Sequence, residues 1–150
     1  MAQRASTITS MLKLSLMNKK VLIIEDEPSI ANIYQLKLKS AGYQSEIIFS
    51  GLEALSAVKS YQPDIILLDL MLPGMSGEKV LEKIRNNPSN RMVPVVVITN
   101  ISKAEAPRTL WHLGISGYIV KASYTPAMVL QVIESVLAEQ AASKLKPTTL

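Results

Sequence analysis

The 150-residue sequence contains no cysteine and only one histidine, His112. Without cysteine there is no disulfide, no thiolate metal site and no cysteine nucleophile. A single imidazole also excludes metal sites built from several histidines. No apolar run approaches the ~18 residues that a membrane-spanning helix requires, so we expect no membrane segment.

The composition is that of one globular domain. Hydrophobic residues make up 48% of the chain and charged residues 19%, which is enough apolar material for a core and too much for disorder. At roughly 150 residues per domain, the length predicts a single domain.

Basic residues outnumber acidic ones, but the excess lies at the ends of the chain. The formal net charge of +4 divides into +4 for residues 1–20, −2 for residues 21–140 and +2 for residues 141–150. We therefore expect a disordered N-terminal extension over 1–20, a mildly acidic domain over 21–140 and a short basic tail over 141–150. Since the basic charge lies in the two tails, we expect no direct nucleic-acid binding.

Within residues 21–140, five short apolar segments alternate with five segments of helical periodicity. Such alternation predicts an α/β fold with a parallel sheet covered on both faces. The apolar segments, read as strands, are 21–24, 43–49, 64–68, 93–98 and 118–120; the helices are 28–41, 51–61, 77–87, 103–113 and 125–139.

Polar residues follow four of these predicted strands directly. The pair Glu25 and Asp26 follows the first strand, Asp69 the third, Thr99 the fourth and Lys121 the fifth. Ligands of open parallel sheets bind outside the carboxyl ends of the strands. The four segments therefore predict one site at this edge of the sheet.

The predicted site suits phosphoryl transfer to a carboxylate. Three carboxylates close together repel one another unless a cation neutralises them, and oxygen ligands favour Mg²⁺. A lysine and a hydroxyl can then bind the remaining oxygens of a phosphoryl group. An ionised aspartate is already a nucleophile and needs no histidine as a general base.

Residues 21–140 resemble the receiver domain of bacterial two-component response regulators. The matching segments are VLIIEDE (21–27), DIILLDLMLPGMSG (64–77), VVVIT (95–99) and GYIVK (117–121). The resemblance implies a flavodoxin-like (βα)5 three-layer sandwich with the parallel strand order 2-1-3-4-5.

The resemblance also implies a role for each site residue. Asp69 corresponds to the phosphoacceptor, and Thr99 and Lys121 to the hydroxyl and the lysine that bind the phosphoryl group. Tyr118 occupies the aromatic switch position. The ligands of Mg²⁺ would be Glu25, Asp26, Asp69 and the backbone carbonyl of Met71.

By this resemblance the chain is a cytoplasmic, phosphorylation-dependent switch, and not an enzyme acting on other molecules. It would receive its phosphoryl group from a histidine kinase or a histidine phosphotransfer protein. Phosphorylation would remodel the face formed by 103–113, 118–120 and 125–139. Because only about ten residues follow Glu139, we expect a single-domain regulator whose output is a partner protein, a homodimer through this face, or a phosphorelay step.

Three features depart from the usual family pattern. Ala122 follows Lys121 where proline is usual, so we expect a trans peptide there and a displaced lysine loop. Asn100 follows Thr99 where a smaller residue is commoner, which would narrow access to Asp69. Met71 and Ile101 would flank the path of hydrolytic water and slow dephosphorylation.

Two other classes of function remain open at this point. The chain could be an interaction module that has the fold but works without phosphorylation. A hydrolase with an aspartate nucleophile fits less well, because a haloacid dehalogenase-like phosphatase needs a second Asp where Met71 stands. Nucleotide-binding relatives need a glycine-rich loop after the first strand, and EDEPS (25–29) contains no glycine.

Overall fold

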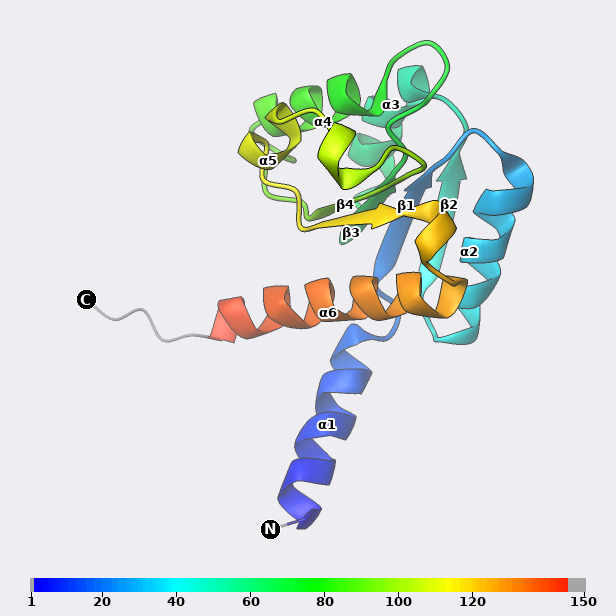
Figure 1. The fold of residues 1–150 in the computed structure, drawn as a ribbon. Helices are drawn as coiled ribbons and strands as arrows, with labels where there is room; N and C mark the ends of the chain where they lie inside the picture. Colours follow the sequence, from blue (N-terminus) through cyan, green and yellow to red (C-terminus); the bar gives the residue numbers. More distant parts are fainter. Residues whose placement is uncertain (1, 146–150) are drawn as a thin grey trace.

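The computed structural model describes residues 2–145, which form one five-stranded parallel sheet between two layers of helices (Figure 1). The strand order β2-β1-β3-β4-β5 is the predicted one. The strands are β1 (Lys20–Ile24), β2 (Gln44–Ile48), β3 (Ile65–Leu68), β4 (Val95–Thr99) and β5 (Gly117–Val120).

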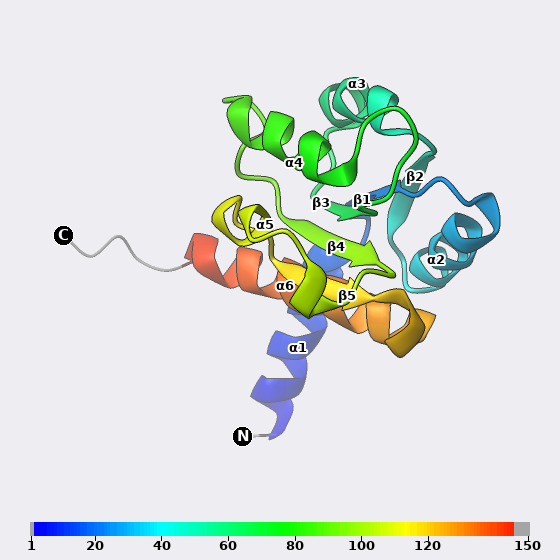
Figure 2. The same ribbon diagram turned by 45° about the horizontal axis from the view of Figure 1, so that its top comes forward.

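The helices cover both faces of the sheet. Helices α2 and α6 lie on one face, and α3, α4 and α5 lie on the other (Figure 2). Their bounds are α1 (Ala2–Leu16), α2 (Pro28–Ser40), α3 (Gly51–Tyr61), α4 (Gly77–Asn86), α5 (Thr109–His112) and α6 (Pro126–Leu145), with two 3₁₀ turns, η1 (Lys103–Glu105) and η2 (Lys121–Ser123).

The core consists of two apolar clusters separated by the sheet. Side chains of a strand alternate between the faces, so Val21 and Ile23 pack with α2 and α6, while Leu22 and Ile24 pack with α3 and α4. All four are fully buried. This burial on both faces explains why β1, β3 and β4 are almost wholly apolar. The edge strand β2 differs from the expectation, because Gln44 and Glu46 are exposed.

Two predicted segments differ from the structure. The stretch 1–20, expected to be a disordered extension, contains the helix Ala2–Leu16, and Leu16 is buried in the core cluster of α2 and α6. The helix predicted over 103–113 is broken into η1 and α5, with Ala106 extended before Pro107. The residue before a proline is disfavoured in the helical region, which accounts for the break.

The basic tail predicted over 141–150 is only partly described. Residues 141–145 continue α6, and residues 146–150 lie outside the described part of the chain. Over the part that is described, no helix combines the length and apolar character needed to cross a membrane.

Candidate functional site

The candidate site lies at the carboxyl edge of the sheet, where β1 and β3 run side by side. Glu25 and Asp26 follow β1, and Asp69 follows β3 by one residue. The Asp69 N–H donates to Ile24 O at 3.0 Å, and the Glu25 N–H donates to Ile48 O at 3.0 Å. The sheet hydrogen bonding therefore fixes the backbone of the acidic residues.

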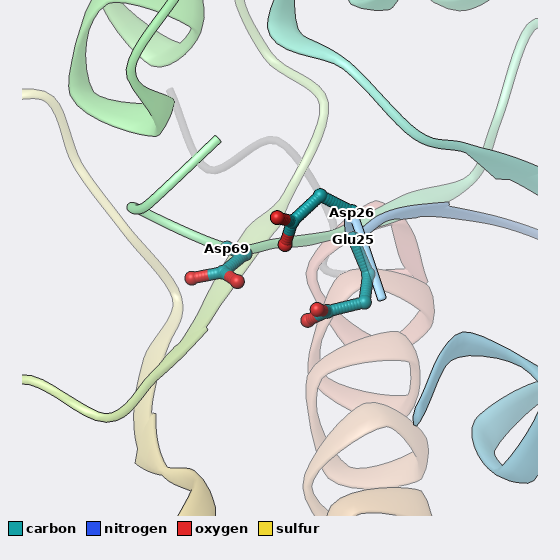
Figure 3. A group of neighbouring side chains, drawn as sticks. All are labelled: Glu25, Asp26 and Asp69. Atoms are coloured by element: carbon teal, nitrogen blue, oxygen red, sulfur yellow. The ribbon is translucent and has the colours of Figure 1, made fainter. Parts of the chain in front are cut away.

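Three carboxylates converge at this edge, as the sequence predicted (Figure 3). One oxygen from each of Glu25, Asp26 and Asp69 lies within 4.8 Å of the others. Glu25 is 1% exposed and Asp69 3% exposed, whereas Asp26 is exposed to solvent. Asp26 is thus the member of the cluster that faces solvent.

Lys121, at the start of η2, joins two of the three carboxylates. Its Nζ lies 2.7 Å from Glu25 Oε2 and donates a hydrogen bond to Asp69 Oδ2 at 2.9 Å. The expected displacement of the lysine loop by Ala122 is therefore not found. The peptide before Ala122 is trans, as are all peptide bonds in the described chain.

Burial and charge compete at these groups. Burial raises the pKa of Glu25 to about 7, with the Asp69 charge adding to the shift and the Lys121 ammonium opposing it. Burial alone would lower the pKa of Lys121, but the two carboxylates outweigh it and raise that pKa. The site thus holds a charged lysine and a carboxyl group that gains a proton near neutral pH.

The donor set fits a divalent cation. When all four groups are ionised, three carboxylates and one ammonium leave a charge of −2. Glu25 Oε2 is the one side-chain oxygen among the described residues that is buried without an aligned hydrogen-bond donor. Oxygen-only ligands of this kind suit Mg²⁺.

The other predicted residues lie close by in the fold. Thr99 is the fully buried last residue of β4, the strand next to β3. The Met71 N–H donates to Asp69 Oδ1 at 3.1 Å, while the predicted role of its carbonyl as a metal ligand stays a prediction. Asn100 is exposed, and nothing in the described contacts shows it narrowing access to Asp69.

Ile101 links the two predicted switch residues through its backbone. Its N–H donates to Thr99 Oγ1 at 3.4 Å, and its carbonyl accepts a hydrogen bond from the Tyr118 hydroxyl at 2.8 Å. The Tyr118 ring also lies 5.7 Å from the ring of Trp111 on α5. Thr99, Tyr118 and α5 are therefore connected through one loop.

Two residues at the site have roles that the sequence did not suggest. A Cβ at Gly77, the first residue of α4, would lie 2.0 Å from Asp69 O, so only glycine lets this helix approach Asp69. The second residue is Tyr34 of α2, which is buried. Burial raises the pKa of its hydroxyl, and the charges of Lys121, Glu25 and Asp69 also act on it.

Comparison with protein families gives an assignment that agrees with this geometry. The family model of the response regulator receiver domain matches residues 21–134. The chain belongs to this family. As a receiver domain of two-component signalling, it carries the fold of a phospho-accepting switch, which confirms the resemblance found in the sequence.

Curated relatives of this receiver domain include longer regulators. It is 33% identical over 118 residues to the DNA-binding response regulator MtrA of Mycobacterium tuberculosis, covering 77% of this chain and 50% of that protein. It is 35% identical over 119 residues to the probable transcriptional regulator ycf27 of Porphyridium aerugineum, covering 79% and 48%. The chain thus spans about half the length of these relatives.

Solved structures with this fold include receiver domains and chemotaxis regulators. The chemotaxis response regulator CheY4 of Vibrio cholerae has a TM-score of 0.73 at 27% identity, covering 79% of this receiver and 98% of that chain. The signal receiver domain of a putative Luxo repressor protein from Vibrio parahaemolyticus has a TM-score of 0.75 at 25% identity, covering 87% and 100%.

Proposed function

We propose that Asp69 accepts a phosphoryl group from the phosphohistidine of a histidine kinase or a histidine phosphotransfer protein. The observation that carries this proposal is the position of Lys121, which bridges Glu25 and Asp69 inside a cluster of three carboxylates. An ammonium at this point can neutralise charge on a transferred group, which is the main requirement of phosphoryl transfer.

In the proposed transfer, an Asp69 carboxylate oxygen attacks the phosphorus of the phosphohistidine. A P–O bond forms as the P–N bond breaks, and the leaving imidazole of the donor takes up a proton. Lys121 binds a phosphoryl oxygen, and Thr99 donates its hydroxyl hydrogen bond to another. Mg²⁺, held by Glu25, Asp26 and Asp69, supplies further neutralisation of the phosphoryl oxygens when it is bound.

The same contacts support a route from Asp69 to the partner-binding face. When Thr99 turns its hydroxyl toward the phosphoryl group, it gives up the N–H of Ile101. The loop carrying Ile101 then keeps its apolar packing and the hydrogen bond that Tyr118 donates to the Ile101 carbonyl. Movement of this loop releases Tyr118 and changes the face of η1, α5, β5 and α6.

The phosphoryl donor would dock at the apolar rim of the acidic site. Phe49 follows β2, Leu52 lies in the first turn of α3, and Met71 follows Asp69 by two residues. These side chains are 44%, 66% and 64% exposed. Exposed apolar groups beside the carboxyl edge of the sheet suit a docking protein that excludes water from the transfer.

The output is proposed to pass to a partner protein or to a second copy through the face of α5, β5 and α6. Trp111 and Met128 are exposed there, by 43% and 41%. We propose that the chain acts as a single-domain regulator in the cytoplasm, without binding nucleic acid or membrane itself. The DNA-binding relatives make a longer regulator the alternative, which the mass of the native protein would reveal.

The test is phosphorylation of the purified protein by acetyl phosphate with Mg²⁺, followed by intact mass measurement. The expected product carries one acid-stable but hydroxylamine-sensitive phosphoryl group, and Asp69→Asn abolishes it. The exposed Asp26 provides the matched variant, because Asp26→Asn should slow the reaction without removing the acceptor. A wild-type protein that takes up no phosphoryl group would make the chain an interaction module independent of phosphorylation.

A further inference from the structure

A second surface lies at the opposite end of the molecule from Asp69, where α1 meets α6. Figures 1 and 2 show α1 projecting from the body, with only its C-terminal end against the other elements. This helix lies outside the residues that match the receiver family, 21–134. The receiver function proposed above does not use it.

The base of α1 is anchored, so the helix leaves the body in a defined direction. Leu16 is buried in the same apolar cluster as Leu137 of α6. The N–H of Asn18 donates to Gly42 O at 2.9 Å, and the side chain of Met17 lies over Gly42. A loosely attached tail would make no such contacts.

Beyond this anchor, α1 presents apolar side chains to solvent. Ile8, Met11 and Leu14 are 64%, 64% and 67% exposed. An isolated helix of about 15 residues is marginal in water unless one face is packed. Burial of these side chains against another molecule would therefore stabilise the helix itself.

A groove of about 470 Å³ runs between the base of α1 and the end of α6. Apolar side chains of Leu16, Leu137 and Val93 line it, and Met92 at its edge is 80% exposed. Lys19 and Lys144 lie on its two sides. The acid in the groove, Asp64, is already occupied, since it accepts from the Lys20 N–H at 2.8 Å and lies 3.9 Å from Lys19 Nζ.

The charge of this end is basic overall, with Asp64 lying beside Lys19 and Glu134 lining the pocket beside Lys13. Residues 1–20 contain four basic residues and no acid, and Lys13 on α1 and Lys144 on α6 are both exposed. We propose that α1 and this groove bind an acidic amphipathic helix of a partner protein. The apolar face of that helix would cover Met11 and Met92, and its carboxylates would lie near Lys19 and Lys144, which line the groove.

Two other occupants fit less well. A second copy would bring together two basic helices that carry no acid, which is unfavourable. Nucleic acid requires closely spaced cations along its phosphates, whereas the groove is lined mainly by apolar side chains. The apolar lining with lysines at its margins favours a protein helix.

The experiment uses the full chain and a labelled peptide with leucine at i, i+3, i+4 and i+7 and glutamate at the remaining positions. Binding is measured by fluorescence anisotropy. The double variant Lys19→Glu/Lys144→Glu should weaken binding about tenfold, since each charge reversal costs roughly 0.7 kcal/mol. The matched control is Lys83→Glu, an exposed charge reversal on α4, which should change the affinity less than twofold.

Hydrogen exchange locates the bound peptide. Protection should appear in α1 and in the end of α6, and Asp69→Asn should show the same protection. Any of four results would overturn the proposal. Two concern the ligand: equal binding of a shuffled peptide of the same composition, or equal competition by duplex DNA. The other two concern the protein: a dimer that already protects α1, or unchanged affinity in Lys19→Glu/Lys144→Glu.

Discussion

Glu25 shows how a single buried carboxyl group sets the chemistry of the site. Its position at the end of β1 removes it from water, and the neighbouring Asp69 carboxylate adds repulsion. The Lys121 ammonium at 2.7 Å offsets only part of the free-energy cost of ionising Glu25, because burial has the larger effect on the pKa of Glu25. A divalent cation would stabilise the ionised form of Glu25 further.

The raised pKa of Glu25 predicts that Mg²⁺ binding depends on pH. With a pKa of about 7, Glu25 is mostly protonated at pH 6 and mostly ionised at pH 8, and metal binding releases its proton. The dissociation constant for Mg²⁺, measured by calorimetry, should therefore fall about tenfold from pH 6 to pH 8. Glu25→Gln should bind Mg²⁺ more weakly and with little pH dependence. A wild-type affinity that stays constant over this range would contradict the assignment of Glu25.

The same shift has a defined sign for the stability of the metal-free protein. The pKa of Glu25 is higher in the folded state than its ordinary value of 4.5, so the folded state binds more protons between these values. The contribution of Glu25 to the free energy of unfolding is therefore complete below about pH 4.5, and it is lost as the pH rises toward about 7. Mg²⁺ would oppose that decline by binding the ionised folded state.

At the scale of elements, Arg85 joins α4 to the segment before β4 and to the segment after α5. Its guanidinium donates to Leu113 O at 2.7 Å, Val93 O at 2.7 Å, Arg91 O at 3.1 Å and Gly114 O at 3.3 Å. These carbonyls belong to the segment before β4 and to the end of α5. One side chain thus fixes the entry to β4 and the end of α5.

Arg85→Lys should lower stability while leaving phosphorylation intact. Lysine lacks the planar fork and cannot reach all four carbonyls, so the free energy of unfolding should fall by about 2 kcal/mol. Urea denaturation measures this loss, and acetyl phosphate labelling of Asp69 should proceed at a rate near that of the wild type. Lys83→Arg, an exposed change on the same helix, should leave stability within about 0.5 kcal/mol. Equal stability of Arg85→Lys and wild type would show that these hydrogen bonds contribute little.

The elements also show which parts of the fold follow from sequence. Runs such as 21–24 and 95–98 are apolar on both faces of a strand. Their strand conformation, and the place of the polar residues after them at the edge of the sheet, were therefore predictable. The break in 103–113 arises at Pro107, which disfavours a helical conformation of Ala106. The prediction followed the helical spacing of the apolar residues and left out this effect of the proline. Helix α1 was missed because its stability depends on Leu16 packing against α6, a contact between distant segments. The close approach at Gly77 likewise exists only in the folded chain.

Across the whole molecule, the two ends of the sheet carry different chemistry. The carboxyl end holds the acidic cluster, and a series of contacts leads from Thr99 through Ile101 and Tyr118 to Trp111 on α5. The other end carries the basic α1, which makes no contact with that series among the contacts described. A signal at Asp69 should therefore reach α5 and leave α1 unchanged.

Trp111 provides a direct measurement of this signal, because it is the only tryptophan in the chain. Its ring lies 5.7 Å from Tyr118, and Lys103 Nζ lies 5.5 Å from its centre. Beryllofluoride, which stands in for the phosphoryl group on Asp69, should shift Trp111 fluorescence in the presence of Mg²⁺. The physical reason is that release of Tyr118 from Ile101 O changes what surrounds the indole ring.

Two variants separate this route from a local effect of the ligand. Asp69→Asn should show no shift, because beryllofluoride then has no carboxylate to bind. Tyr118→Phe retains the ring but lacks the hydrogen bond to Ile101 O, so its basal fluorescence should already lie toward the beryllofluoride-bound value, with a smaller further change. A full-sized shift in Tyr118→Phe would mean that the signal reaches α5 without the Tyr118 hydroxyl, and that the loop carrying Ile101 moves by itself.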